Sequence, residues 1–133
     1  MIKVHNDATN DLKSIKNINK DLFSRILTLI QQLKNDEKLI KILLEHKSDK
    51  EEKISVQELV RVKKQENLII RRLKFHELEK DGIKYRIIYY FDWKIKDYYI
   101  MAIINRDDLD YDNPNDTTIC RVINAIKREF PGQ

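Results

Sequence analysis

Three runs rich in β-branched and aromatic residues, separated by short polar connections, place the strongest limit on the fold of this chain. The runs are LIIRRLKF (68–75), KYRIIYYF (84–91) and DYYIMAII (97–104). Residues of this kind, bounded by polar turns, are typical of β-strands. The connections 76–83 and 92–96 are short enough for antiparallel hairpins. We therefore expect an antiparallel meander in which 84–91 pairs with both other strands. The run 97–104 is apolar on both faces, which predicts a covered strand.

Amphipathic helices are expected before the meander. Residues 2–4 could form a short first strand, and Asn6 or Asp7 after it could cap a first helix. Asn19 is a good cap for a second helix, whose apolar positions between 22 and 33 follow a period of 3.6 residues. The two segments predict a helical hairpin at the N-terminus.

Two further segments complete the interpretation. The polar run HKSDKEEK (46–53) predicts a loop, and NPND (113–116) predicts the cap of a C-terminal helix. No secondary structure is predicted for residues 54–66. Ser55 and Glu58 have the spacing of a helix capping box, whereas the apolar residues of the same segment could equally belong to a strand. Helices, then a meander, then a helix indicate an α+β fold. The length of 133 residues suits a single domain spanning 1–133.

Charge is unevenly distributed along the chain. Residues 54–75 contain six basic and two acidic side chains, whereas residues 105–133 contain four basic and six acidic ones. A clustered basic stretch is typical of a protein that binds a polyanion. The alternative is an ordinary solvated surface.

Several classes of protein are disfavoured by what the sequence contains. The three histidines are scattered, Cys120 is the only cysteine, and no glycine-rich phosphate loop is present. We therefore expect neither a metal nor a cofactor. No segment approaches the roughly 20 apolar residues of a membrane span, and the N-terminus has no apolar run. These features favour a cytoplasmic protein without a membrane partner.

Strand periodicity groups five candidate functional residues. Arg72 and Lys74 share one face of their strand, Arg86 lies in the next strand, Arg106 follows the third, and Tyr111 comes five residues later. If the strands are neighbours, the four cations converge on a solvent-exposed concave surface. Such a surface could hold a phosphodiester backbone and stabilise the additional charge of its transition state. The alternative is a set of solvated charges that discourages aggregation of the sheet.

The order of these segments resembles the RelE/ParE superfamily of toxins from type II toxin–antitoxin systems. The resemblance extends from about residue 7 to residue 127. Its strongest local match is Tyr85-Arg86-Ile87-Ile88-Tyr89, which is similar to a strand motif of that superfamily, and the next is an apolar strand ending in Arg106. The resemblance implies a twisted antiparallel sheet backed by the N-terminal helical hairpin.

The resemblance also implies an activity. RelE-like members are metal-independent endoribonucleases that cut mRNA on the ribosome, where the ribose 2′-hydroxyl attacks the adjacent phosphate. By position, Arg86 and Arg106 would stabilise transition-state charge, Arg72 and Lys74 would handle phosphate and protons, and Tyr111 would stack on a base or transfer a proton. A cognate antitoxin protein is the implied partner. Two alternatives stay open: a ParE-like inhibitor that binds DNA gyrase, and a non-toxic relative that only binds a partner.

Overall fold

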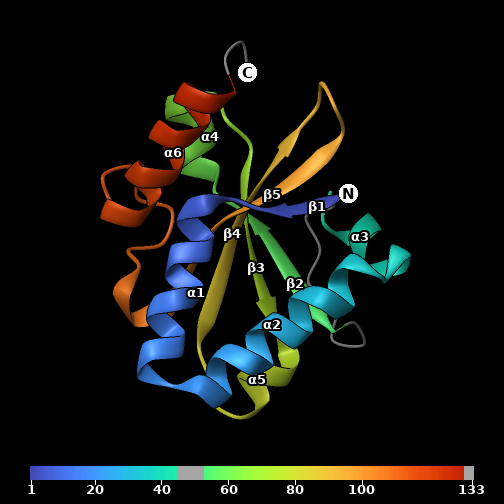
Figure 1. Ribbon diagram of the computed structural model, residues 1–133. Helices are drawn as coiled ribbons and strands as arrows, with labels where there is room; N and C mark the ends of the chain where they lie inside the picture. Colours follow the sequence, from blue (N-terminus) through green and yellow to red (C-terminus); the bar gives the residue numbers. More distant parts are fainter. Residues whose placement is uncertain (45–52, 131–133) are drawn as a thin grey trace.

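The computed structural model describes residues 1–44 and 53–130 and contains a five-stranded sheet with helices on both faces (Figure 1). The strands are β1 (Ile2–Val4), β2 (Ile54–Glu58), β3 (Ile70–Phe75), β4 (Tyr85–Asp92) and β5 (Asp97–Asn105). The helices are α1 (Asn6–Ile18), α2 (Lys20–Lys34), α3 (Glu37–Ile42), α4 (Val60–Glu66), α5 (His76–Lys80), α6 (Thr117–Glu129) and the 3₁₀ helix η1 (Arg106–Asp108). The α+β class and the C-terminal helix are as predicted.

The strands follow the order β1-β5-β4-β3-β2. As predicted, β4 pairs antiparallel with both β3 and β5. The expectation of a purely antiparallel sheet is wrong, because β1 pairs parallel with β5 at the edge and makes the sheet mixed. A strand of three residues carries no local signal of its direction or partner, so the sequence could not reveal this pairing.

Two separate cores hold the helices against the sheet. On one face lie the two predicted N-terminal helices, α1 and α2, while α4 and α6 lie beside each other on the opposite face (Figure 1). Helix α2 begins at Asn19, whose Oδ1 accepts from Leu22 N at 3.1 Å, and buries Ile26, Ile30 and Leu33 along one stripe. Strand β5 contributes to both cores, which confirms the prediction of a strand covered on each face.

The first helix begins one residue earlier than expected. Its N-cap is His5 rather than Asn6 or Asp7, and the His5 Nδ1 accepts from the Asp7 backbone N–H at 3.1 Å. Histidine is not among the residues preferred at the N-cap, so capping preferences favoured Asn6 and Asp7 instead. The connection 76–83, predicted as a simple hairpin, contains the short helix α5. Of the predicted loop 46–53, residues 46–52 lie outside the described residues.

Residues 54–66, for which no secondary structure was predicted, contain both a strand and a helix. Residues 54–58 form β2 and residues 60–66 form α4. Ser55 and Glu58 therefore lie in a strand and do not form a capping box. The first turn of α4 is instead capped from a distant loop, because the Asp112 carboxylate accepts from the backbone N–H of Arg61 at 2.9 Å and of Val62 at 3.2 Å.

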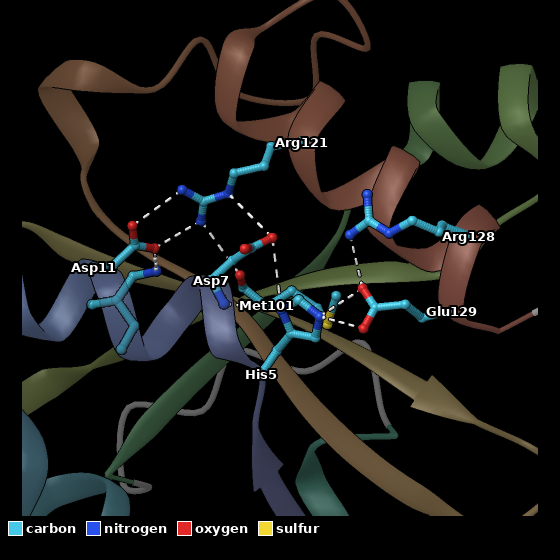
Figure 2. Close-up of polar contacts among 8 residues, drawn as sticks. His5, Asp7, Asp11, Met101, Arg121, Arg128 and Glu129 are labelled. Carbon is cyan, nitrogen blue, oxygen red and sulfur yellow. Dashed lines mark hydrogen bonds and ion pairs between the residues drawn. The ribbon is translucent and has the colours of Figure 1, made fainter.

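A polar network fastens α6 to α1 and to the edge of β5 (Figure 2). Two guanidinium nitrogens of Arg121 donate to the Asp11 carboxylate at 3.1 and 2.8 Å. One oxygen of Asp11 also accepts from the backbone N–H of Ile103 at 2.9 Å, beyond the point where β1 ends. His5 Nε2 lies 2.8 Å from a carboxylate oxygen of Glu129. Asp11 therefore satisfies an edge group of the sheet that its short neighbouring strand does not reach.

Among the described residues, no helix combines the length and the apolar character that crossing a lipid bilayer requires.

Candidate functional site: a cationic cavity

A cavity of about 530 Å³ lies on the face of the sheet that carries α4 and α6. Its lining includes every side chain that the sequence proposed: Arg72, Lys74, Arg86, Arg106 and Tyr111. We call this the cationic cavity. The size is within the range of ligand-binding pockets. The structure therefore brings all five candidates together, while their catalytic roles remain predictions.

Strands β3 and β4 position three of the cations. Arg72 and Lys74 are two residues apart on β3 and point to the same face, whereas Leu73 between them packs in the core on the other face. Arg72 is opposite Ile88 in the register, so that Arg86, two residues before Ile88, belongs to the same face of β4. The cluster thus results from strand alternation and from one antiparallel pairing.

The loop after β5 supplies the other two side chains. The backbone N–H of Arg106 donates to the carbonyl of Lys84 at 2.7 Å, which fixes η1 beside the start of β4. The Tyr111 hydroxyl donates to the carbonyl of Glu58 at 3.2 Å. The Arg72 guanidinium lies 5.7 Å from the centre of the Tyr111 ring, a cation–π distance. Tyr111 therefore forms one wall of the cavity and contacts a cation of the cluster.

Arg86 differs from the solvated side chain that the sequence suggested. Only 5% of the residue is exposed. Its Nη1 contacts the Glu79 carboxylate and lies 3.3 Å from the Tyr85 carbonyl. Burial lowers the pKa of Arg86, and the charge of Glu79 opposes that shift. A buried cation without a partner would be costly, so Glu79 compensates the charge of Arg86 within the protein.

The clustered cations change the acid–base properties of Lys74. Loss of solvent lowers the pKa of the Lys74 ammonium, and the nearby charge of Arg72 lowers it further. Burial also lowers the pKa of Arg72, partly offset by Tyr111. The pKa of Tyr111 is raised by burial and held down in part by Arg72. Lys74 therefore releases its proton more readily than an exposed lysine, while Tyr111 retains its own.

Sequence reasoning missed three residues of the site. Gln57 and Leu109 line the cavity, and Glu79 pairs with Arg86. Gln57 was overlooked because residues 54–66 were assigned no state. In β2, Gln57 is directly opposite Arg72 of β3, and this pairing places it on the face that carries the cavity. Glu79 lies in the connection 76–83, where no local sequence signal indicates that its side chain points toward Arg86.

His76 lies near the end of β3, outside the lining of the cavity. Its Nε2 is 2.6 Å from the Oγ of Ser55, which is buried. Over residues 1–44 and 53–130, no group of three His, Cys, Asp or Glu side chains is arranged so that it could hold a metal ion.

Comparisons of this chain with protein-family models, with curated proteins and with solved structures each found no match.

Proposed function

We propose that the cationic cavity binds the phosphodiester backbone of RNA and that the protein is a metal-independent endoribonuclease of the RelE/ParE toxin type. The observation that carries the proposal is the convergence of four cations and one tyrosine, from β3, β4 and the loop after β5, on a single cavity. Clustered Arg and Lys side chains recognise phosphate through charge and through N–H donors. The likeness of the strand motif at 85–89 to that superfamily adds the RNA substrate.

The proposed reaction needs no group beyond the RNA and the protein. The ribose 2′-hydroxyl oxygen attacks the adjacent phosphorus, and the bond from phosphorus to the 5′-oxygen breaks. One proton leaves the 2′-hydroxyl and one reaches the departing 5′-oxygen, giving a 2′,3′-cyclic phosphate and a 5′-hydroxyl. Negative charge increases on the phosphoryl oxygens in the transition state, where preorganised cations stabilise it most effectively.

The environment of each side chain suggests its role. Arg86 and Arg106 would contact the phosphoryl oxygens, with Arg86 held by Glu79. Lys74 would exchange the proton, because its lowered pKa makes the neutral amine more accessible than in an exposed lysine. Arg72 would assist at the phosphate. Tyr111, which retains its proton, would support a base or donate a hydrogen bond.

The partners follow from the same proposal. The substrate would be mRNA on the ribosome, in the cytoplasm, and the inhibitor would be an antitoxin encoded beside this gene. An acidic segment of such an antitoxin would be attracted to the basic stretch 61–74 and would cover the cationic cavity.

The experiment compares two activities side by side. The wild type and Arg106→Ala are induced in cells, mRNA 5′ ends are mapped, and the purified proteins are assayed for inhibition of gyrase supercoiling. We expect translation-dependent cuts that Arg106→Ala reduces by about 10²–10³, the usual effect of removing one transition-state contact. Arg106 is exposed and lies outside the core, so the variant should fold. Arg128→Ala is the matched control, because Arg128 is an exposed arginine on α6.

Each outcome separates the candidate functions. Intact mRNA together with failed supercoiling would replace the nuclease by a ParE-like gyrase inhibitor. Cuts that persist in Arg106→Ala would leave a nuclease and reject this site. Absence of both effects would point to a non-toxic, partner-binding relative.

A further inference from the structure

The side-chain amide of Gln57 has a defined orientation in the cationic cavity. Gln57 on β2 is directly opposite Arg72 on β3, and an Arg72 Nη2–H donates to the Gln57 Oε1. A guanidinium offers only N–H donors, so the atom that faces it must be the amide oxygen. The Nε2 amino group of Gln57 therefore points away from Arg72, which removes the usual ambiguity between the two ends of an amide.

The other polar groups of the cavity are also donors. Among the described residues, Gln57 Nε2 has no hydrogen-bond partner, and Gln57 is exposed. Lys74 and Arg106 contribute only N–H donors. A ligand that fits must therefore present acceptors, both at its phosphate and beside Gln57.

The remaining walls suit a flat ring. Leu109 and the ring of Tyr111 line the cavity together with Gln57. An apolar side chain and an aromatic ring are the surfaces on which proteins place unstacked bases. The cavity thus combines cations for a phosphate with an apolar wall and one amide donor for an adjacent base.

We propose that Gln57 is a specificity-determining residue that selects a nucleobase with a carbonyl edge next to the bound phosphate. The inference rests on the proposed RNA-binding function. Guanine offers O6 and N7 as acceptors on one edge, whereas adenine has an amino donor in place of O6. The Gln57 amino group donates to the guanine edge and meets a second donor at the corresponding position of adenine.

Ribonucleoside 3′-monophosphates test this inference without the ribosome. The purified protein is titrated with inorganic phosphate and with the 3′-monophosphates of guanosine, inosine and adenosine, and binding is followed by NMR. Inosine shares the carbonyl edge of guanine and lacks only its exocyclic amino group. We expect guanosine and inosine to bind about equally, each roughly tenfold more tightly than adenosine.

Variants assign the preference to one side chain. Gln57→Leu removes the donor, and the ratio of guanosine to adenosine affinity should fall to about one. Gln57→Glu keeps an acceptor for Arg72 and places a second acceptor toward the base, so the ratio should invert in favour of adenosine while all affinities fall. Gln65→Leu is the matched control, because Gln65 is an exposed glutamine on α4 outside the cationic cavity, and it should keep the wild-type ratio.

These measurements distinguish a failure of the inference about Gln57 from a failure of the proposed RNA-binding function. Equal binding of guanosine and adenosine to the wild type would overturn the inference, as would a preference that persists in both Gln57 variants. In either case binding of inorganic phosphate would leave the proposed function standing. A wild type that binds neither phosphate nor any nucleotide would overturn both.

Discussion

The carboxylate of Glu79 contacts the guanidinium of Arg86, and this contact joins α5 to the wall of the cationic cavity. The side chain of Arg86 is 6% exposed and that of Glu79 is 25% exposed. The pair therefore has a structural role in addition to any role in binding. Removing the cation would leave a partly buried carboxylate without compensation.

We predict that Arg86→Met lowers the free energy of unfolding by about 2 kcal/mol, less than for a fully buried pair because Glu79 is partly solvated. The double variant with Glu79→Gln should recover part of that loss, since no uncompensated charge remains. Urea denaturation measures both. Lys84→Met is the control, because Lys84 is exposed and directly precedes β4. Equal stability of Arg86→Met and the control would show that the pair contributes nothing.

The lowered pKa of Lys74 gives a pH signature. If the neutral amine accepts the proton, cleavage should rise with pH and level off below 10.5, the ordinary pKa of lysine, because desolvation and Arg72 favour the neutral form. Lys74→Arg keeps the positive charge and cannot exchange the proton. It should lower the cleavage rate by about 10²–10³ while changing RNA affinity by less than about threefold. Single-turnover rates and filter binding separate the two quantities. A Lys74→Arg enzyme of normal rate would restrict Lys74 to phosphate binding.

Asp11 should make a larger contribution to stability than a surface acid. It accepts two N–H groups from Arg121 and one from the backbone of Ile103 (Figure 2). We predict that Asp11→Ala costs about 2–3 kcal/mol, because a backbone donor and a guanidinium both lose their acceptor. Asp21→Ala, at an exposed position in the first turn of α2, should cost less than about 1 kcal/mol. Thermal or urea unfolding of the pair provides the measurement, and similar losses in both variants would contradict the prediction.

The features that the sequence predicted correctly have local causes. The alternation of Arg72, Leu73 and Lys74 determines which side chains share a face, and the short connections allow neighbouring strands to pair. The cap of α2 at Asn19 is equally local. The sequence could therefore predict that all four cations lie on one surface, as they do in the cationic cavity.

The features that the sequence could not predict depend on contacts between distant residues. Asp112 caps α4 across a separation of 51 residues from Arg61, and β1 pairs with β5, where 96 residues separate the partners Ile2 and Tyr98. The partner of Arg86 is Glu79, which lies in α5, a helix that was not predicted within the connection 76–83. Neither periodicity nor capping preference carries information about such pairs. The burial of Arg86 and its ion pair with Glu79 are therefore visible only in the structure.

Asp107 and Asp108 are two exposed carboxylates beside Arg106 in η1. Their charges oppose the approach of a phosphate backbone to the cationic cavity, and solvent and salt screen this repulsion. We predict that the double variant Asp107→Asn/Asp108→Asn binds single-stranded RNA several-fold more tightly at low ionic strength, chiefly through a faster association rate. RNA binding by the double variant should depend more steeply on salt than binding by the wild type. The gain in affinity should therefore disappear toward 1 M salt, where the screening length falls to about 3 Å.

The matched control is Asp21→Asn/Glu37→Gln, which removes two exposed acids from the N-terminal turns of α2 and α3 and changes the net charge by the same amount. Stopped-flow association with a labelled RNA oligonucleotide compares the two pairs across a salt series. A larger gain for Asp107 and Asp108 than for the control would place the RNA beside η1. Equal gains would mean that the net charge of the protein governs association, and no change in either pair would argue that RNA approaches a different surface.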